Sequence, residues 1–181
     1  MTQASPDPAV IAKKALAAYA KEQFNEAIEL FQEAREGYDA SGDPLQAAEI
    51  ANNLSVALIQ VGRHQAALDN LVGTYDIFID RGEMIKAAQA LGNEAAAHEG
   101  LNNWERAESL YQQAAERFSD LDDHDSQRFT LQALSRVRLR QGRAIEAVST
   151  MRGALETGTK NTWSNRLAKK ILNLPSRILK P

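Results

Sequence analysis

The sequence repeats itself at a step of 40 residues, and this period constrains the fold more than any other feature. One alanine and two large apolar or aromatic residues return at the same places in successive units. The columns are Ala27, Ala67, Ala107 and Ala147; Phe31, Leu71, Tyr111 and Met151; and Tyr38, Phe78 and Phe118. A fixed period of this length is typical of a solenoid, because each unit can bury its apolar face only against its neighbours.

Each unit has the pattern of two helices joined by a short turn. Apolar residues recur at three- and four-residue steps, as in residues 24–34, which is the spacing of a helix with one buried face. Gly62-Arg63 and Gly142-Arg143 indicate turns within units, and Asn102-Asn103 occupies the same place in the third unit. Asp43-Pro44 indicates a helix start, with an N-cap aspartate followed by proline.

These signals predict an all-α fold, since no stretch alternates polar and apolar residues long enough to suggest a strand. The predicted helices cover residues 7–20, 24–40, 44–61, 64–80, 84–101, 104–120, 125–141, 144–157 and 162–173. They form four hairpin repeats at 7–40, 44–80, 84–120 and 125–157. A basic capping helix and tail at 162–181 complete a single domain over residues 1–181.

Composition and motifs argue against chemistry. The chain has no cysteine, which excludes disulfides, thiolate metal sites and cysteine catalysis. His64 and His98 fall at packing positions of the repeat, and His124 lies in an inter-repeat turn where neighbouring aspartates cap helices. Phosphate-binding loops, nucleophile elbows and zinc spacings are missing from the sequence. We therefore expect no enzymatic activity, no metal and no cofactor.

The spacing within the unit resembles the tetratricopeptide repeat (TPR). The resemblance rests on Phe24-x-x-Ala27-x-x-x-Phe31-x-x-Ala34 and Trp104-x-x-Ala107-x-x-x-Tyr111-x-x-Ala114. The usual TPR period is 34 residues, so a step of 40 implies longer helices. Long repeats with an Asn-Asn-Leu segment, here Asn52-Asn53-Leu54, are similar to those of kinesin light chain and related bacterial regulators. The resemblance implies a right-handed α-α superhelical solenoid that binds proteins without catalysing a reaction.

By the same resemblance, the first helix of each hairpin lines a concave groove. The groove residues expected from the 40-residue register are Glu49, Asn52, Asn53, Val56, Ile59, Gln89, Asn93, Phe129, Gln132, Arg136 and Arg140. Asn53 and Asn93 share one repeat position, where amides can hydrogen-bond the backbone of an extended peptide. The alternative is that these asparagines tie adjacent helices together. Arg136 and Arg140 either select carboxylates of an acidic or mixed polar partner or pair with acids of a neighbouring repeat.

Charge is distributed unevenly along the chain. Residues 1–125 carry 9 basic and 22 acidic side chains (−13), whereas residues 126–181 carry 12 and 2 (+10). The tail is amphipathic, with Arg166, Lys169 and Lys170 among its bases and Trp163 as its aromatic anchor. It is interpreted either as a cap for the last repeat or as a dock for an acidic partner, an anionic membrane face or, least favoured, nucleic acid.

Three functions follow as alternatives. The first is an adaptor or scaffold that holds a protein or peptide partner in its groove. The second is a structural subunit that assembles into a homo-oligomer, the acidic part of one copy meeting the basic end of the next. The third is a module that senses a peptide or small molecule. An apolar leader is missing at the amino terminus and no apolar run approaches ~18 residues, so a cytoplasmic location is expected.

Overall fold

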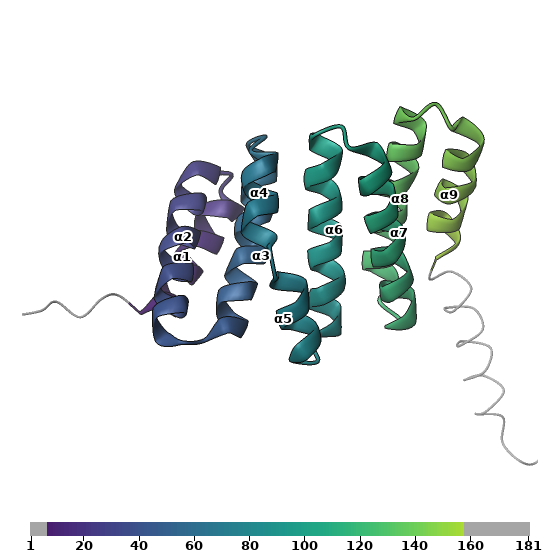
Figure 1. The fold of residues 1–181 in the computed structure, drawn as a ribbon. Helices are drawn as coiled ribbons and strands as arrows, with labels where there is room; N and C mark the ends of the chain where they lie inside the picture. Colours follow the sequence, from purple (N-terminus) through teal and green to yellow (C-terminus); the bar gives the residue numbers. More distant parts are fainter. Residues whose placement is uncertain (1–6, 158–181) are drawn as a thin grey trace, which may run out of the picture.

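The computed structural model describes residues 7–157, and within them every regular element is an α-helix (Figure 1). The helices are α1 (Pro8–Ala20), α2 (Phe24–Ser41), α3 (Pro44–Gln60), α4 (His64–Leu71), α5 (Thr74–Asp80), α6 (Met84–Gly100), α7 (Trp104–Asp120), α8 (His124–Arg140) and α9 (Ala144–Glu156). They form an α-solenoid of stacked antiparallel pairs, which confirms the all-α prediction. The expected helix at 162–173 and the basic tail lie outside the described residues.

The turns recur on the same step as the helices. Within residues 7–157, a residue with left-handed backbone lies in every turn within a hairpin and in every turn between hairpins. The first set is Glu22, Gly62, Asn102 and Gly142, with φ of 61°, 75°, 60° and 79°; the second is Gly42, Gly82 and Asp122, with φ of 71°, 73° and 56°. Glycine reaches this conformation without strain, whereas for other residues the conformation is strained and lowers the stability of the fold. The turns therefore repeat in conformation even where the residue type changes.

One predicted helix is wrong. The prediction of a single helix over 64–80 fails because the chain breaks between α4 and α5, where Val72 is extended and Gly73 has a φ of 75°. Val72 is 79% exposed, so the break brings an apolar side chain to the surface. Glycine both weakens the helix and permits the left-handed turn. After the break, Phe78 of α5 packs in a separate buried cluster with Ala48, Ala87 and Ala90.

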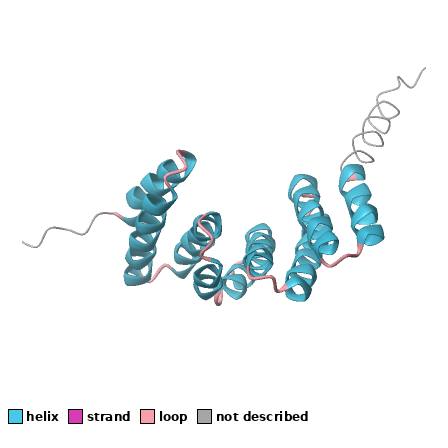
Figure 2. Cartoon of the chain, turned by 90° about the horizontal axis from the view of Figure 1, so that it is seen from above, coloured by secondary structure: helices cyan, strands magenta, loops and turns pink. Residues whose placement is uncertain are grey.

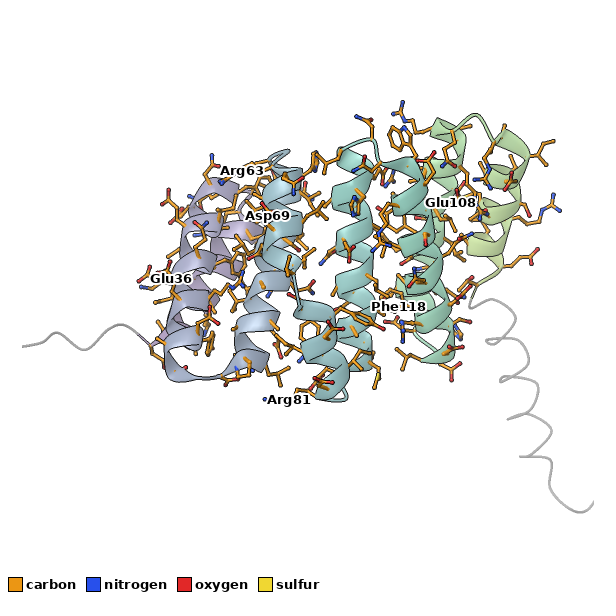
Figure 3. All side chains as sticks on the ribbon, in the orientation of Figure 1. Glu36, Arg63, Asp69, Arg81, Glu108 and Phe118 are labelled. Atoms are coloured by element: carbon orange, nitrogen blue, oxygen red, sulfur yellow. The ribbon has the colours of Figure 1, made fainter. Side chains whose placement is uncertain are left out.

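A buried carboxylate holds the last three helices together. Glu108 of α7, labelled in Figure 3, has a side chain only 12% exposed. Its Oε1 accepts a hydrogen bond from Nε of Arg138 on α8 at 2.9 Å, and its Oε2 accepts one from Arg143 at the start of α9. Burial would raise the pKa of Glu108, but the hydrogen bonds from Arg138 and Arg143 outweigh it and hold the pKa below its ordinary value of 4.5.

The array ends in an apolar stripe. On α9, Ala147, Thr150 and Ala154 are buried, while Ile145 and Val148 are 88% and 63% exposed. Within residues 7–157, α8 is the helix that packs most closely against α9. The described part of the chain therefore leaves this stripe uncovered.

The turn pattern leads to a stability prediction. Glu22 is exposed and holds the left-handed conformation that glycine holds in two equivalent turns, so Glu22→Gly should raise the free energy of unfolding by about 1 kcal/mol. Glu26 is also exposed but lies in the first turn of α2, so Glu26→Gly should lower it by about 1 kcal/mol. Urea denaturation of both variants measures the two values, and a loss of stability in Glu22→Gly would contradict the assignment of this turn.

Glu108 leads to a pH prediction. Because its folded pKa is depressed, its contribution is complete above the ordinary pKa and is lost as pH falls through the folded value. Glu108→Gln should lower the free energy of unfolding by about 1.5–3 kcal/mol near neutral pH, and the difference from wild type should shrink below pH 4.5. Glu105→Gln, at an exposed site on the same helix, is the control and should change little. A difference that does not vary with pH would exclude the depressed pKa.

Candidate functional site

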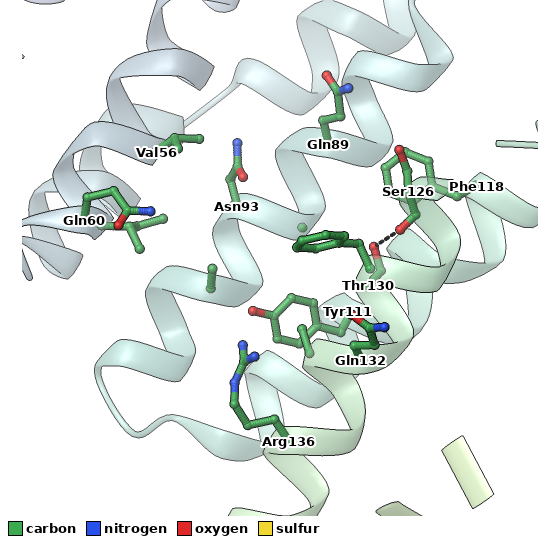
Figure 4. Close-up of a pocket in the computed structure, with 15 residues that line it drawn as sticks. Val56, Gln60, Gln89, Asn93, Tyr111, Phe118, Ser126, Thr130, Gln132 and Arg136 are labelled. Carbon is green, nitrogen blue, oxygen red and sulfur yellow. Dashed lines mark hydrogen bonds between the residues drawn. The ribbon is translucent and has the colours of Figure 1, made fainter. Parts of the chain in front are cut away.

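The helix pairs follow an arc when the array is seen from above (Figure 2). Helices α3, α6 and α8 line a groove with a volume of about 550 Å³, and two side chains of α7 reach it from behind. Figure 4 shows side chains of these helices turned toward one opening. The lining residues are Val56, Ile59, Gln60, Gln89, Gly92, Asn93, Ala96, Tyr111, Phe118, Ser126, Phe129, Thr130, Gln132, Ala133 and Arg136. The groove is the candidate functional site.

The predicted site residues divide into two groups in space. Most line the groove: Val56, Ile59, Gln89, Asn93, Phe129, Gln132 and Arg136. The remaining residues in the described part of the chain lie beside it. Glu49 pairs with Lys86 of α6, Asn52 is buried against α6, Asn53 is partly buried on α3, and Arg140 is exposed at the end of α8. Trp163, Arg166, Lys169 and Lys170 lie outside the described residues.

Asn93 and Asn53 differ in whether they tie adjacent helices together, which was the alternative to peptide binding. Asn93 Nδ2 donates a hydrogen bond to Oδ1 of Asn52 at 2.7 Å, so this pair ties α6 to α3 as the structural alternative predicts. Asn93 still lines the groove, which leaves its remaining hydrogen-bonding atoms available there. Within residues 7–157 the Asn53 amide makes no hydrogen bond to another protein atom. That Asn53 and Asn93 bind a peptide stays a prediction.

Arg136 already has an ionic partner. Its Nε and Nη2 donate to the two carboxylate oxygens of Glu99 on α6 at 2.6 and 2.9 Å. Tyr111 of α7 donates its hydroxyl to the same carboxylate at 2.9 Å. Burial, then the nearby carboxylate of Glu99, raises the pKa of Tyr111, so the phenol stays protonated as the donor. The pairing of Arg136 with a neighbouring repeat, one of the two alternatives, is therefore present.

Phe129 is the most exposed large aromatic side chain of the groove. It is 76% exposed on α8, while the aromatic rings of Tyr111 and Phe118 behind it are almost fully buried. Sequence reasoning assigned Tyr111 and Phe118 to the repeated core columns and missed that they also reach the groove. Their positions on the second helix of the hairpin gave no signal for this, because helix length and tilt decide which rings reach between α6 and α8.

Within residues 7–157 no group of three or more His, Cys, Asp or Glu side chains is placed to hold a metal ion. None of the helices in that range is long and apolar enough to cross a membrane. Half of the basic residues on which self-assembly was predicted lie outside this range, so self-assembly stays a prediction.

The asparagine geometry can be tested through stability. Asn93→Ala removes the bond to Asn52 and leaves a buried amide without its partner, so the free energy of unfolding should fall by about 1–2 kcal/mol. Asn53→Ala should cost less than about 0.5 kcal/mol, because that amide bonds to no other described residue. Denaturant unfolding of the two variants gives the comparison, and equal losses would remove the distinction between them.

The sequence matches a known repeat family over most of its length. The profile described as the tetratricopeptide repeat matches residues 7–79 and 86–159. No relative among curated proteins matches the sequence.

Solved structures of several kinds share the fold. The Rap conjugation gene regulator of plasmid pLS20, in complex with the Phr* peptide, matches with a TM-score of 0.71 at 15% identity, over 81% of this chain and 41% of that one. The apo form of RapI matches with a TM-score of 0.77 at 16% identity, over 93% and 62%. A putative kinesin light chain from Podosopora anserina gives 0.70 at 18% identity, over 88% and 76%. At these identities the likeness concerns the fold, and this chain spans less than two thirds of either Rap protein.

Proposed function

Because the chain belongs to the tetratricopeptide repeat family, we propose that it is a non-enzymatic adaptor that holds an extended segment of a partner protein in the groove of α3, α6 and α8. The observation that carries the proposal is Phe129, a large aromatic side chain left 76% exposed in a groove about 550 Å³ in volume. Exposed apolar surface in a concave site rimmed by polar groups is typical of a binding site.

The polar lining suits a peptide main chain. Gln60 and Gln89 are exposed at the groove, and Gln132 is partly exposed on its far side. Each side-chain amide offers a donor and an acceptor, which is what an extended backbone presents in turn. Hydrogen bonds to the main chain can form with peptides of many different sequences. An apolar contact at Phe129 would then favour peptides that carry a suitable side chain at that point. The Rap regulator solved with the Phr* peptide supports the proposal as an example of this fold with a peptide bound.

The groove favours a mixed polar segment over a strongly acidic one. The guanidinium of Arg136 is bound through two hydrogen bonds to Glu99, and the ammonium of Lys86 is bound to Glu49. A ligand carboxylate would have to displace an existing partner from either cation. The sequence-based expectation of an acidic or mixed polar partner is therefore narrowed to the mixed polar class.

The proposal is tested by selecting binders from random peptides about 12 residues long, which span ~40 Å when extended. Synthetic copies of the selected peptides are then titrated against three proteins by fluorescence polarisation. Phe129→Ala should weaken binding about tenfold or more, because a hot-spot aromatic is removed. Leu139→Ala removes an apolar side chain of similar exposure on the same helix outside the groove, and it should bind as wild type does. Equal affinity for wild type and Phe129→Ala would move the site elsewhere.

A further inference from the structure

Gly92 occupies a place in the groove where the protein itself has no need of glycine. It lies in the middle of α6, where glycine lowers helix stability by about 1 kcal/mol relative to alanine. Apart from its chain neighbours and the backbone of its own helix, a Cβ built on Gly92 would meet no described atom within 4 Å. By contrast, a Cβ on Gly37 would come within 2.8 Å of Pro8, and one on Gly100 would overlap the ring of His64. Packing explains those two glycines but not Gly92 or Gly153, and of these last two Gly92 is the one that lines the groove.

The open space beside Gly92 belongs to the groove. Gln89, Gly92, Asn93 and Ala96 face it from α6 at the spacing of one helix face. The equivalent positions one step away carry Asn52 on α3, which is buried and bonded to Asn93, and Gln132 on α8, which lines the groove. Because it has no side chain, Gly92 makes a low point on the α6 face of the groove, with Phe129 and Ala133 beyond it on α8. Helix backbone is accessible there to a ligand.

We propose that the main chain of the bound segment crosses α6 at Gly92 and places an uncharged aromatic or large aliphatic side chain against Phe129. This inference rests on the proposed function and adds the site of closest approach and the class of segment. Because glycine has no side chain, another backbone can approach it more closely than it can approach any other residue. The amides of Gln89 and Asn93 flank the crossing point and can bond the ligand main chain on either side.

Charge complementarity selects the class of segment. Arg136, the charged residue among those that line the groove, is paired with Glu99, and Lys86 beside the groove is paired with Glu49. When a ligand charge is buried against groups that already have ionic partners, it gains little electrostatic attraction and loses its own hydration. An uncharged segment does not lose hydration in this way. Its apolar side chain makes the free energy of binding more favourable by covering the exposed ring of Phe129. Binding should accordingly change little with ionic strength.

The experiment compares two glycine-to-alanine variants of the whole chain. Gly92→Ala and Gly153→Ala both fill open space within a helix, since a Cβ on Gly153 of α9 also meets no described atom within 4 Å. Both should raise the free energy of unfolding. The probes are the synthetic peptides selected on the wild-type protein from the random library. Gly92→Ala should weaken their binding about tenfold or more, as one extra carbon does in a tight site, and Gly153→Ala should leave it within about twofold.

The outcomes are distinguishable. A Gly92→Ala protein that binds these peptides as wild type does, while Phe129→Ala fails to bind, overturns the crossing point and leaves the proposed function standing. Selected peptides rich in acidic residues, with binding lost at high salt, overturn the uncharged class. Peptides that bind all variants equally overturn the proposed function itself. A variant that is more stable and yet binds less well supports the inference, because a folding defect cannot produce that pair of results.

Discussion

The array depends on the close approach of helix backbones at its alanine positions. Ala27, Ala67 and Ala107 are fully buried, and Ala147 is nearly so. A methyl group is the largest side chain that such a seam accepts without moving the helices apart, and the gain comes from many short contacts. The large side chains Phe31, Phe78 and Phe118 then fill the space between successive pairs. This division between small seam residues and large filling residues sets the spacing of α3, α6 and α8, and hence the width of the groove.

The ionic groups between the last helices and those at the groove have different effects. Glu108 lies with Arg138 and Arg143 between the last helices, where burial makes the loss of any one partner costly. Arg136 and Glu99 form their pair at the groove, and the Arg136 side chain is 55% exposed. Pairs of this exposure add little stability, so their main effect is on the field that a ligand meets. The first set holds the fold, and the second shapes the chemistry of the site.

Most of the fold was accessible from the sequence because it repeats. Helix pairing, the turns at Gly62 and Gly142 and the placement of Phe129 and Asn93 on one face all follow from a helical period combined with a step of 40. The break at Gly73 did not follow, since apolar spacing continues through it into Tyr75 and Phe78 and only tertiary packing favours two short helices.

The site was less predictable than the fold. The partner of Arg136 was left open, because a sequence cannot show which acid of the next repeat lies within bonding distance. Tyr111 and Phe118 were placed in the core and found also behind the groove. The repeat register gives the face of a helix, whereas the depth of the groove depends on how the helices are tilted and on which side chains reach through.

The left-handed turn residues also define the smallest unit of change in this architecture. Glu22, Gly62, Asn102 and Gly142 keep one step, and so do Gly42, Gly82 and Asp122. Removing or copying 40 residues moves each turn onto an equivalent turn, while any other length places a helix interior where a turn must form. Chains of this kind can therefore lengthen or shorten by duplication and loss of whole units, and each such event widens or narrows the concave surface by one helix.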